Sequence, residues 1–313
     1  MAEAAQRSTQ QRRAFALLAV PVLLFGTAWP VNKLALAGMP PLWFATGRVA
    51  VGALISFLLL AALRQLRRPT RRDLPIILTV GLLQLALFFL LTNEALAHLP
   101  AGRSVVLSST TTLWLVPITL ITGEPIPPLR WLGVGAGLAG IVTLANPWSL
   151  DWRAPGVALG HLYLLLAALA WACAIVHARR HRWNLAPLQL LPWQMLLAAL
   201  VLLPVTLLLD PDPRIEPSLT VIGGFLYVAV LSGPLASWTA VLVARDLPTV
   251  VSSLGFLGIP ALGLLLSTTL LGEPVTWSLG GGAALILAGV ALAILAPARL
   301  TPPPAATSAP PPR

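Results

Sequence analysis

The sequence predicts an all-α integral membrane protein with ten transmembrane helices, arranged as two inverted five-helix repeats. The first observation is composition: 57% of the 313 residues are apolar, only 10% are charged, and the mean hydropathy is +0.86. A soluble domain with a polar shell does not have this composition. The second observation is a repeated phrase, because TGEPIPPLRWLGVGAGLAG at 122–140 returns as LGEPVTWSLGGGAALILAG at 271–289.

Apolar segments of membrane-spanning length fill almost the whole chain. A helix needs about 20 mainly apolar residues to cross roughly 30 Å of hydrocarbon. Ten such segments, joined by short polar stretches, are predicted at 14–37, 41–62, 74–96, 101–122, 129–146, 156–178, 187–209, 219–243, 248–271 and 275–296. We divide the chain into a cytoplasmic N-terminal tail (1–13), a first repeat (14–147), a second, inverted repeat (148–297) and a disordered cytoplasmic tail (298–313).

The net charge of +10 could indicate a nucleic-acid partner, but the basic residues follow a membrane pattern. With the N-terminus inside, fifteen of the twenty lie in inner segments, Arg48 lies within a span, and four are outer: Lys33, Arg103, Arg153 and Arg214. Because cytoplasmic loops carry the excess of Lys and Arg, we expect both termini to be cytoplasmic. The expected partners are therefore the lipid bilayer and a small-molecule substrate, with no nucleic acid.

A second echo shows that the repetition is ordered along the chain. LPAGRSVVLSS at 99–109 resembles LPTVVSS at 247–253, close to the 149-residue offset of the Gly-Glu-Pro phrase. Each echo follows a predicted helix. Because five is an odd number, a second five-helix half enters the membrane from the opposite side. Inverted repeats of this kind are typical of alternating-access transporters.

The chain resembles the drug/metabolite transporter superfamily over about 14–296, and within it the EamA-domain, ten-helix bacterial exporters, including the aromatic amino-acid branch. The residues that carry the resemblance are Phe25-Gly26, Asn32-Lys33, Pro40-Pro41 through Arg48, the run Glu94 to Gly102, and the Gly-Glu-Pro repeat. The family usually has Trp-Gly where this chain has Phe25-Gly26, and the prolines that it places in helix four match Pro117 and Pro260. The resemblance implies a bacterial inner-membrane location and a central cavity lined by helices one, three, four, six, eight and nine.

Charged residues in the spans offer three candidates for gating or substrate contact. Charges at the bilayer centre cost about 2.5–3.5 kcal/mol on insertion scales. Glu94 is the deepest of the acidic residues, near the outer end of helix three, so no midplane carboxylate is available for a proton relay. Arg48 or Lys33 could pair with Glu94 in an outward-closed state, meet a substrate carboxylate, or snorkel to the headgroups.

Uncharged polar and aromatic residues mark the candidate substrate site. Helix four carries five consecutive hydroxyls at 108–112, which either pack helices or line a polar stripe, and Trp171 lies far from any helix end. The predicted substrate-binding residues are Gln84, Phe88, Ser108, Thr111, Trp114, Trp171, Ser237, Trp238 and Phe256. Prolines inside the spans act as gating hinges or passive bends, and those chosen for gating are Pro117, Pro234 and Pro260.

Enzyme interpretations find little support in the sequence. His177 and His181 lie in a basic helix end without a neighbouring carboxylate or Cys to complete a metal site, and no cofactor motif occurs. We therefore predict no enzyme, no metal and no cofactor. The predicted function is the export of small metabolites, first of all amino acids including aromatic ones, by an uncoupled carrier. The alternatives are an exporter of amphipathic drugs or other metabolites, a non-transporting membrane sensor and an intramembrane hydrolase. The glycine-rich fifth and tenth helices form either packed scaffold or a dimer face, which leaves a monomer or a homodimer.

Overall fold

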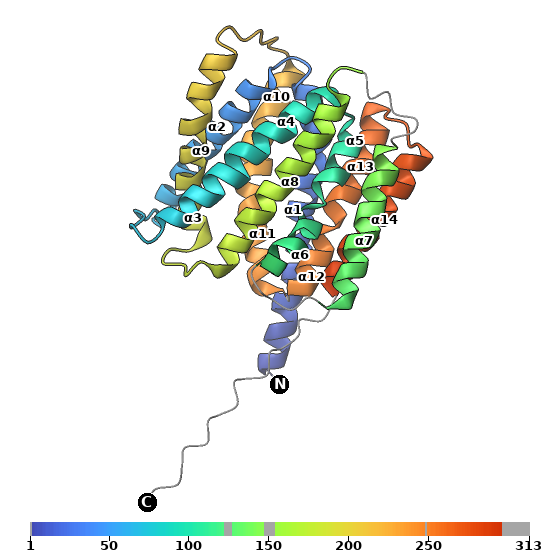
Figure 1. Ribbon diagram of the computed structural model, residues 1–313. Helices are drawn as coiled ribbons and strands as arrows, with labels where there is room; N and C mark the ends of the chain where they lie inside the picture. Colours follow the sequence, from blue (N-terminus) through green and yellow to red (C-terminus); the bar gives the residue numbers. More distant parts are fainter. Residues whose placement is uncertain (1, 122–126, 147–153, 248, 296–313) are drawn as a thin grey trace, which may run out of the picture.

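The computed structural model describes residues 2–121, 127–146, 154–247 and 249–295, and the regular elements in these ranges are all helices (Figure 1). The first half contains α1 (Ala2–Ala35), α2 (Pro41–Ala62), α3 (Leu74–Thr79), the π-helical η1 (Val80–Leu87), α4 (Phe88–His98), α5 (Ala101–Ser108), α6 (Thr111–Ile121) and α7 (Pro128–Ala145). The second contains α8 (Val157–Arg180), α9 (Pro187–Leu209), α10 (Leu219–Leu226), the π-helical η2 (Tyr227–Leu235), α11 (Ala236–Asp246), α12 (Thr249–Phe256), α13 (Gly258–Leu271) and α14 (Trp277–Leu295).

Eight helices of the described residues are long and apolar enough to cross a membrane. They are Ala16–Ala35, Pro41–Ala62, Leu74–His98, Val157–Arg180, Pro187–Leu209, Leu219–Val243, Val251–Leu271 and Trp277–Leu295. The other two predicted spans are present as shorter helices, since the fourth consists of α5 and α6 and the fifth is α7. The membrane class and the all-helical fold are confirmed, while ten transmembrane helices stay a prediction.

The structure describes the predicted N-terminal tail from Ala2 on, but not the predicted C-terminal tail or the boundary between the two repeats. α1 begins at Ala2, so the predicted tail at 1–13 continues the first helix from that residue on. The predicted tail at 298–313 and the boundary between residues 147 and 148 lie outside the described residues.

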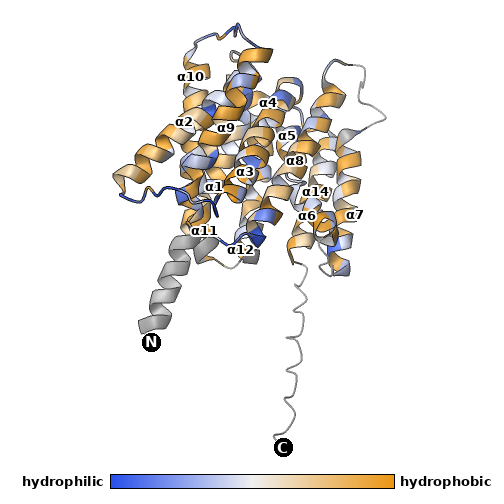
Figure 2. Cartoon of the chain, turned by 60° about the vertical axis from the view of Figure 1, so that its left-hand side comes forward, coloured by the Kyte–Doolittle hydropathy of each residue, from blue (hydrophilic) through white to orange (hydrophobic). Residues whose placement is uncertain are grey.

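Apolar side chains cover the outside of the bundle. Leu208 is 81% exposed, Leu219 90% and Trp277 97%. Figure 2 shows hydrophobic residues along the helices and hydrophilic ones mainly near the helix ends and in the connecting segments. An apolar surface of this extent is unfavourable in water and suits contact with lipid.

The helices run up and down between two ends of the bundle (Figure 1). We call the end at which α1 begins and α14 ends the terminal end, and the opposite end, which holds the α1–α2 turn, the distal end. α2 packs against α9 and η2, α9 packs against η1, and α7 packs against α14. α4 packs against α8, and α1 against α11. Numbered by predicted span, the packed pairs are 2 with 7, 2 with 8, 3 with 7, 5 with 10, 3 with 6 and 1 with 8. If each span of one half is replaced by its counterpart in the other half, such as 1 by 6 and 8 by 3, the same six pairs result.

Irregular helical geometry also recurs in the two halves. π-helical turns occupy Val80–Leu87 in the third predicted span and Tyr227–Leu235 in the eighth. The fourth span is interrupted between Ser108 and Thr111, and the ninth between Phe256 and Gly258. Two independent irregularities therefore recur at almost the spacing of the sequence repeat.

The helix containing Pro234 differs in one respect from the sequence prediction. A break at Ser232-Gly233-Pro234 is expected from the sequence, but the chain stays helical there through η2 into α11. Proline has no N–H to donate, and its ring clashes with the carbonyl of the preceding turn in a regular α-helix. The wider π-helical turn gives the ring more room, so the helix can continue through Pro234.

Glycines hold α7 and α14 at close range. A Cβ added to Gly133 would lie 2.6 Å from the carbonyl oxygen of Gly289, and one added to Gly289 would lie 2.5 Å from the carbonyl oxygen of Gly133. Only glycine permits this backbone approach. The scaffold interpretation of these helices is confirmed within the chain, and Gly135, which has nothing within 4 Å of its added Cβ, faces away from the seam.

Candidate functional site

An aromatic group joins α4 to α8 in the middle of the bundle. The rings of Phe88 and Trp171, which come from separate halves, meet edge to face with centroids 4.4 Å apart and planes at 67°. Phe89 extends the group, with its centroid 5.7 Å from that of Phe88. Both predicted residues are partly buried. The structure thus brings together two of the predicted substrate-binding residues, and Phe89 is a neighbour that sequence reasoning missed.

Arg48 is buried beside this aromatic group. Its guanidinium carbon lies 3.8 Å from the centroid of the Phe89 ring, and the residue is only 7% exposed. This geometry is a cation–π contact, which is stronger when desolvated. Arg48 is therefore enclosed by the bundle and does not snorkel along its outer surface. Within the described residues its guanidinium forms no hydrogen bond or ion pair.

Lys33 closes the end of α4 at the distal end. Its Nζ donates to the carbonyl oxygen of Leu96 at 2.5 Å and to that of Leu99 at 3.0 Å. A cation satisfies the last carbonyls of a helix and suits the negative end of its dipole. Within the described residues, neither Lys33 nor Arg48 forms an ion pair with Glu94. The predicted charge pairs are absent from this conformation, and a gating role for the three residues stays a prediction.

Glu273, in the second Gly-Glu-Pro copy, caps a helix of the opposite half. Its Oε1 accepts the N–H of Ala101 at 2.6 Å and its Oε2 accepts the N–H of Gly102 at 2.9 Å. The first N–H groups of α5 have no partner within their own helix, and a carboxylate there also suits the helix dipole. The second copy of the phrase therefore fastens α5 to the α13–α14 connection. The first copy, Gly123-Glu124-Pro125, lies outside the described residues.

Four of the five hydroxyls at 108–112 are bonded to backbone carbonyls of their own span. Ser108 donates to the carbonyl oxygen of Val105 at 2.8 Å, and Thr111 donates to that of Ser108 at 2.9 Å. Ser109 and Thr110 do the same toward residues 105 and 107. Back-bonding of this kind uses the hydroxyl hydrogen and leaves the oxygen able to accept. The run can therefore offer acceptors to a ligand that donates.

Three further predicted residues have no polar or ring partner in the described structure. Gln84 lies in η1, Trp114 in α6 and Ser237 at the start of α11, and all three are partly buried. No hydrogen bond or ring contact of the described chain joins them to another predicted site residue. The structure therefore leaves their proposed contact with substrate as a prediction.

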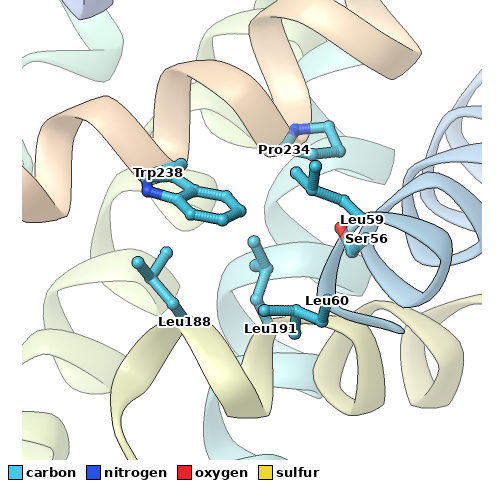
Figure 3. Close-up of a pocket in the computed structure, with 7 residues that line it drawn as sticks. All are labelled: Ser56, Leu59, Leu60, Leu188, Leu191, Pro234 and Trp238. Atoms are coloured by element: carbon cyan, nitrogen blue, oxygen red, sulfur yellow. The ribbon is translucent and has the colours of Figure 1, made fainter. Parts of the chain in front are cut away.

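Trp238 and Pro234 line a separate pocket toward the terminal end (Figure 3). The lining residues, from α2, α9, η2 and α11, are Ser56, Leu59, Leu60, Leu188, Leu191, Pro234 and Trp238. In Figure 3 the indole of Trp238 lies above Leu188 and the leucines of α2 and α9 surround the opening. This pocket is apolar apart from the Ser56 hydroxyl, and it does not include the Phe88–Trp171 pair.

The remaining predicted residues lie near the helix breaks. Phe256 packs against Val243 and Leu247 with residues 17 and 18 of α1, which places it toward the terminal end and away from a shared site with Trp171. Pro260 falls in the first turn of α13, where its missing N–H is tolerated, and Pro117 lies inside α6. The interrupted spans therefore carry a proline after each break.

Buried polar residues are the part of the site that sequence reasoning missed. Asn93 is fully buried with no hydrogen bond to either side-chain amide atom, Asn32 has an unbonded Oδ1, and Ser232 has an unbonded Oγ. Nearby, the hydroxyls of Thr27 and Tyr227 contact each other. Asn93 has a weak sequence signal, because it is a polar residue inside the apolar run FFLLTNEALAH, but its closeness to the helix end hides its depth.

The described residues provide no cluster of three or more His, Cys, Asp or Glu side chains that could hold a metal ion. The rings of His177 and His181 lie 5.8 Å apart, and the Nδ1 of His177 is 2.6 Å from the Thr79 hydroxyl. These histidines pair with aromatic and hydroxyl groups, which are not a metal-ligand set.

Comparison with known proteins places this geometry in context. The model of the EamA-like transporter family matches the chain twice, over residues 12–146 and 158–295. A protein of known crystal structure superposes with a TM-score of 0.62 and 20% identity, over 91% of this chain and 98% of that chain, which shows the fold alone. The two tandem matches agree with the repeated irregularities of the helices.

Curated relatives are similar over most of their length. The chain is 28% identical to the uncharacterized transporter YvbV of Bacillus subtilis, over 88% of this chain and 90% of the relative. It is 27% identical to the uncharacterized inner membrane transporter YedA of Escherichia coli K12, over 84% of each chain. Protein PecM of Dickeya dadantii is 31% identical over 60% of this chain and 62% of PecM.

Proposed function

The chain belongs to the EamA-like transporter family, and we propose that it exports small metabolites, first of all amino acids including aromatic ones, by alternating access. The proposed location is the bacterial inner membrane, which is the one in the name of the YedA relative. The charge bias of the sequence supports an orientation with the terminal end in the cytoplasm.

The observation that carries the mechanism is the duplicated architecture. The π-helical segments at Val80–Leu87 and Tyr227–Leu235, the interrupted fourth and ninth spans, and the exchange symmetry of the helix pairs all support two equivalent halves. Two halves of five spans enter the membrane from opposite sides, so rocking one against the other opens a shared site alternately to each side. Contacts such as that of Glu273 with α5 join the halves and must rearrange when the distal end opens.

The substrate proposal rests on the chemistry of the central helices. Phe88 and Trp171 offer aromatic surface to an apolar side chain. Ser108 and Thr111 offer acceptor oxygens, which suit donor hydrogens of a polar substrate. A compact zwitterion with an apolar side chain fits both features.

Transport without proton coupling is the simplest mechanism for these residues. All ten acidic residues of the sequence lie at helix ends or in connections, with Glu94 the deepest, about a turn from the end of α4. A buried midplane carboxylate is the usual device for a proton relay in membranes. We therefore propose a facilitator whose direction follows the substrate gradient.

Counterflow in proteoliposomes tests this proposal. Vesicles loaded with unlabelled amino acids are offered labelled Trp, Phe, Leu, Ala or Glu without any ion gradient. We expect uptake of Trp and Phe above the others, and at least about a tenfold loss in Trp171→Ala, because an aromatic contact is removed from the site. The matched control is Trp277→Ala, since Trp277 is 97% exposed on the outside of the bundle. Absence of counterflow for every amino acid would reject the substrate proposal.

The apolar pocket of Figure 3 favours a second candidate, the export of amphipathic drugs. The pocket has room for about one water molecule in this conformation, so its leucines and Trp238 would have to separate to take an apolar body. It lies toward the end proposed to face the cytoplasm. The same vesicles distinguish the candidates. Inhibition of labelled Phe counterflow by a lipophilic cation that is relieved in Trp238→Ala but unchanged in the exposed control Trp277→Ala would support this second site. Uptake of the cation alone, with no amino-acid flux, would replace the first proposal.

A further inference from the structure

Four incompletely bonded polar side chains share one level of the bundle. On the distal side of that level, Ala35 of α1, Phe44 of α2 and Val228 of η2 form one buried cluster. One turn further into the bundle from these three residues come Asn32, Arg48 and Ser232, at spacings of three or four residues. Three helices that pack together therefore bring three polar side chains to the same depth.

The fourth polar side chain comes from α4. Phe89 lies under the guanidinium of Arg48, and Asn93 follows Phe89 by one helical turn on the same face. Packing of α4 against α2 and α1 places Asn93 in the same region. We call Asn32, Arg48, Asn93 and Ser232 the Arg48 cluster.

Each member of the Arg48 cluster is buried and lacks hydrogen bonds. The exposed fractions are 6% for Asn32, 7% for Arg48, 0% for Asn93 and 1% for Ser232. The orphaned atoms are Asn32 Oδ1, both amide atoms of Asn93 and Ser232 Oγ, while the guanidinium has only the Phe89 ring. Buried polar groups of folded proteins are nearly always bonded, and a concentration of exceptions around one cation points to a ligand or water site.

The charge of the cluster specifies the ligand. A buried cation is retained when a partner neutralises it, yet the described residues supply no carboxylate to Arg48. The planar guanidinium matches a carboxylate through two parallel N–H donors. The side-chain oxygens of Asn32 and Asn93 and the hydroxyl of Ser232 can accept hydrogen from an ammonium group beside it.

We propose that the Arg48 cluster is the head-group site of the carrier, where Arg48 binds the substrate carboxylate and the asparagines and Ser232 bind its ammonium. This inference rests on the proposed function, and it names the group that every substrate shares. Binding is by charge-assisted hydrogen bonds only, with no covalent step.

The aromatic residues give the substrate a direction. The guanidinium carbon of Arg48 lies 3.8 Å from the centroid of the Phe89 ring. The ring centroids of Phe89 and Phe88 are 5.7 Å apart, and those of Phe88 and Trp171 are 4.4 Å apart. An amino acid held by its head group at Arg48 extends its side chain toward Phe88 and Trp171. The site therefore requires the carboxylate and prefers aromatic side chains to smaller apolar ones.

Matched ligand pairs test the carboxylate on the wild-type protein, with no risk of misfolding. Labelled phenylalanine counterflow is competed with unlabelled phenylalanine, phenylalaninamide and phenethylamine, which keep the ring and the amine while the carboxylate is changed or removed. We expect the two analogues to compete at least about tenfold more weakly, because the amide loses the charge-assisted contacts of the guanidinium. Equal competition by all three ligands would overturn the Arg48 inference while the transport proposal stands.

Variants then assign the effect to Arg48. Arg48→Gln and Arg48→Lys are compared with Arg214→Gln, which removes an exposed arginine at the same end of the bundle. We expect Arg48→Gln to raise the phenylalanine KM by about tenfold or more and to abolish the preference for the acid over the amide. Arg48→Lys should keep part of the preference, because it keeps the charge but not the paired donors. A preference for the acid that persists in folded Arg48→Gln would exclude Arg48 as its source.

Binding in detergent separates the two proposals. Phenylalanine should raise the melting temperature of the wild type more than phenylalaninamide does, and this difference should disappear in Asn93→Leu and Arg48→Gln. If neither ligand stabilises the protein and no amino acid shows counterflow, both the amino-acid proposal and the head-group site are rejected. If phenylalanine is transported but its amide stabilises equally, the cluster is a structural water site.

Discussion

The contact between α7 and α14, which we call the α7–α14 seam, and the Arg48 cluster are both buried. The seam consists of closely packed glycine backbone, whereas the cluster consists of polar side chains without hydrogen bonds. At the seam, Gly133 and Gly289 bring two backbones so close that each added Cβ would lie within 2.6 Å of the facing carbonyl oxygen. In the Arg48 cluster, a guanidinium and the two amide atoms of Asn93 are buried without hydrogen bonds. The seam maximises packing, while the cluster leaves favourable contacts unmade.

This difference indicates where the molecule is stable and where it binds. Helices in lipid associate through close packing, so the seam supplies a fixed frame. Buried polar groups without partners destabilise a fold and are retained at sites where a ligand completes them. Mutations in the two regions should therefore change stability in opposite directions.

The largest expected effect is at the seam. In Gly289→Ala the new Cβ would meet the Gly133 carbonyl oxygen at 2.5 Å and the Gly137 backbone nitrogen at 2.7 Å. Backbone atoms cannot turn aside as a side chain can, so we expect a loss of about 3 kcal/mol or more, or no folded protein. The measurement is the melting temperature in detergent together with the yield of monodisperse protein.

The matched control is on the opposite face of α7, two residues from the contact at Gly133. A Cβ added to Gly135 has nothing within 4 Å. Gly135→Ala should therefore leave the fold intact and add about 0.5–1 kcal/mol, because alanine restricts the unfolded chain and favours the helix. Equal loss of stability in both variants would remove the seam from the comparison.

Glu273 tests a third kind of contact, in which a partly buried carboxylate accepts two backbone N–H groups. Glu273→Gln keeps the shape of the side chain but weakens the two bonds to Ala101 and Gly102. We expect a loss of about 1–2 kcal/mol, since hydrogen bonds to a charged group are stronger than neutral ones. It is measured by thermal unfolding, with Glu216→Gln, an exposed glutamate at the same end, as the control.

Opening of the distal end gives Glu273 a second readout. If its bonds to α5 join the two halves, weakening them should increase the labelling of a cysteine introduced at the distal end. Unchanged labelling with reduced stability would limit Glu273 to a helix cap.

Much of this architecture could be predicted from the sequence, because membrane burial and repetition leave strong patterns. Apolar length predicted the helical membrane class, and the Gly-Glu-Pro repeat predicted two related halves, which the family matches and the recurring π-helical turns support. Phe88 and Trp171 were selected separately on the third and sixth spans, and their contact is a finding of the structure. Periodicity and the family resemblance were sufficient for the helical class and the two halves.

Other features depend on contacts between distant segments, which a single sequence does not encode visibly. Trp238 and Phe256 looked equivalent to Trp171 in hydropathy, but their helices turn them toward the terminal end. Asn93 was missed because depth in the bundle depends on how α4 packs against α2 and α8, and not on distance from the end of the helix. The partners of Lys33 are backbone carbonyls, which have no signature in a sequence.

A smaller effect, of opposite sign, is expected inside the Arg48 cluster. Asn93→Leu replaces an unbonded buried amide with an apolar side chain of similar size. We expect stability to rise by about 1 kcal/mol, because the penalty for the unbonded amide is removed, and phenylalanine counterflow to fall. Melting temperature and transport are measured on the same preparations. A parallel loss of both quantities would show that Asn93 is part of the packed core.

The smallest effect is expected at Asp73, a buried carboxylate that lies before α3 and has donors at one of its two oxygens, while its Oδ1 is unbonded. Its Oδ2 accepts the N–H and the hydroxyl of Thr70, each at 2.8 Å, and the amide N–H of Asn184 at 3.2 Å. Burial alone would raise the pKa of Asp73, but these hydrogen bonds favour the charged form and hold the pKa below its ordinary value of 3.8.

A depressed pKa fixes the direction of the pH dependence at Asp73. The stabilisation is fully present above the unfolded pKa, about 4, and is lost as the pH falls through the lower folded value. The melting temperatures of wild type and Asp73→Asn should therefore differ by a constant amount from pH 8 to about pH 5 and converge in more acidic buffer. A difference that persists unchanged at pH 3 would mean that Asp73 acts by shape alone. Convergence would show that donors of the protein stabilise the charged form of Asp73 through Oδ2, whereas the guanidinium of Arg48 has only the Phe89 ring.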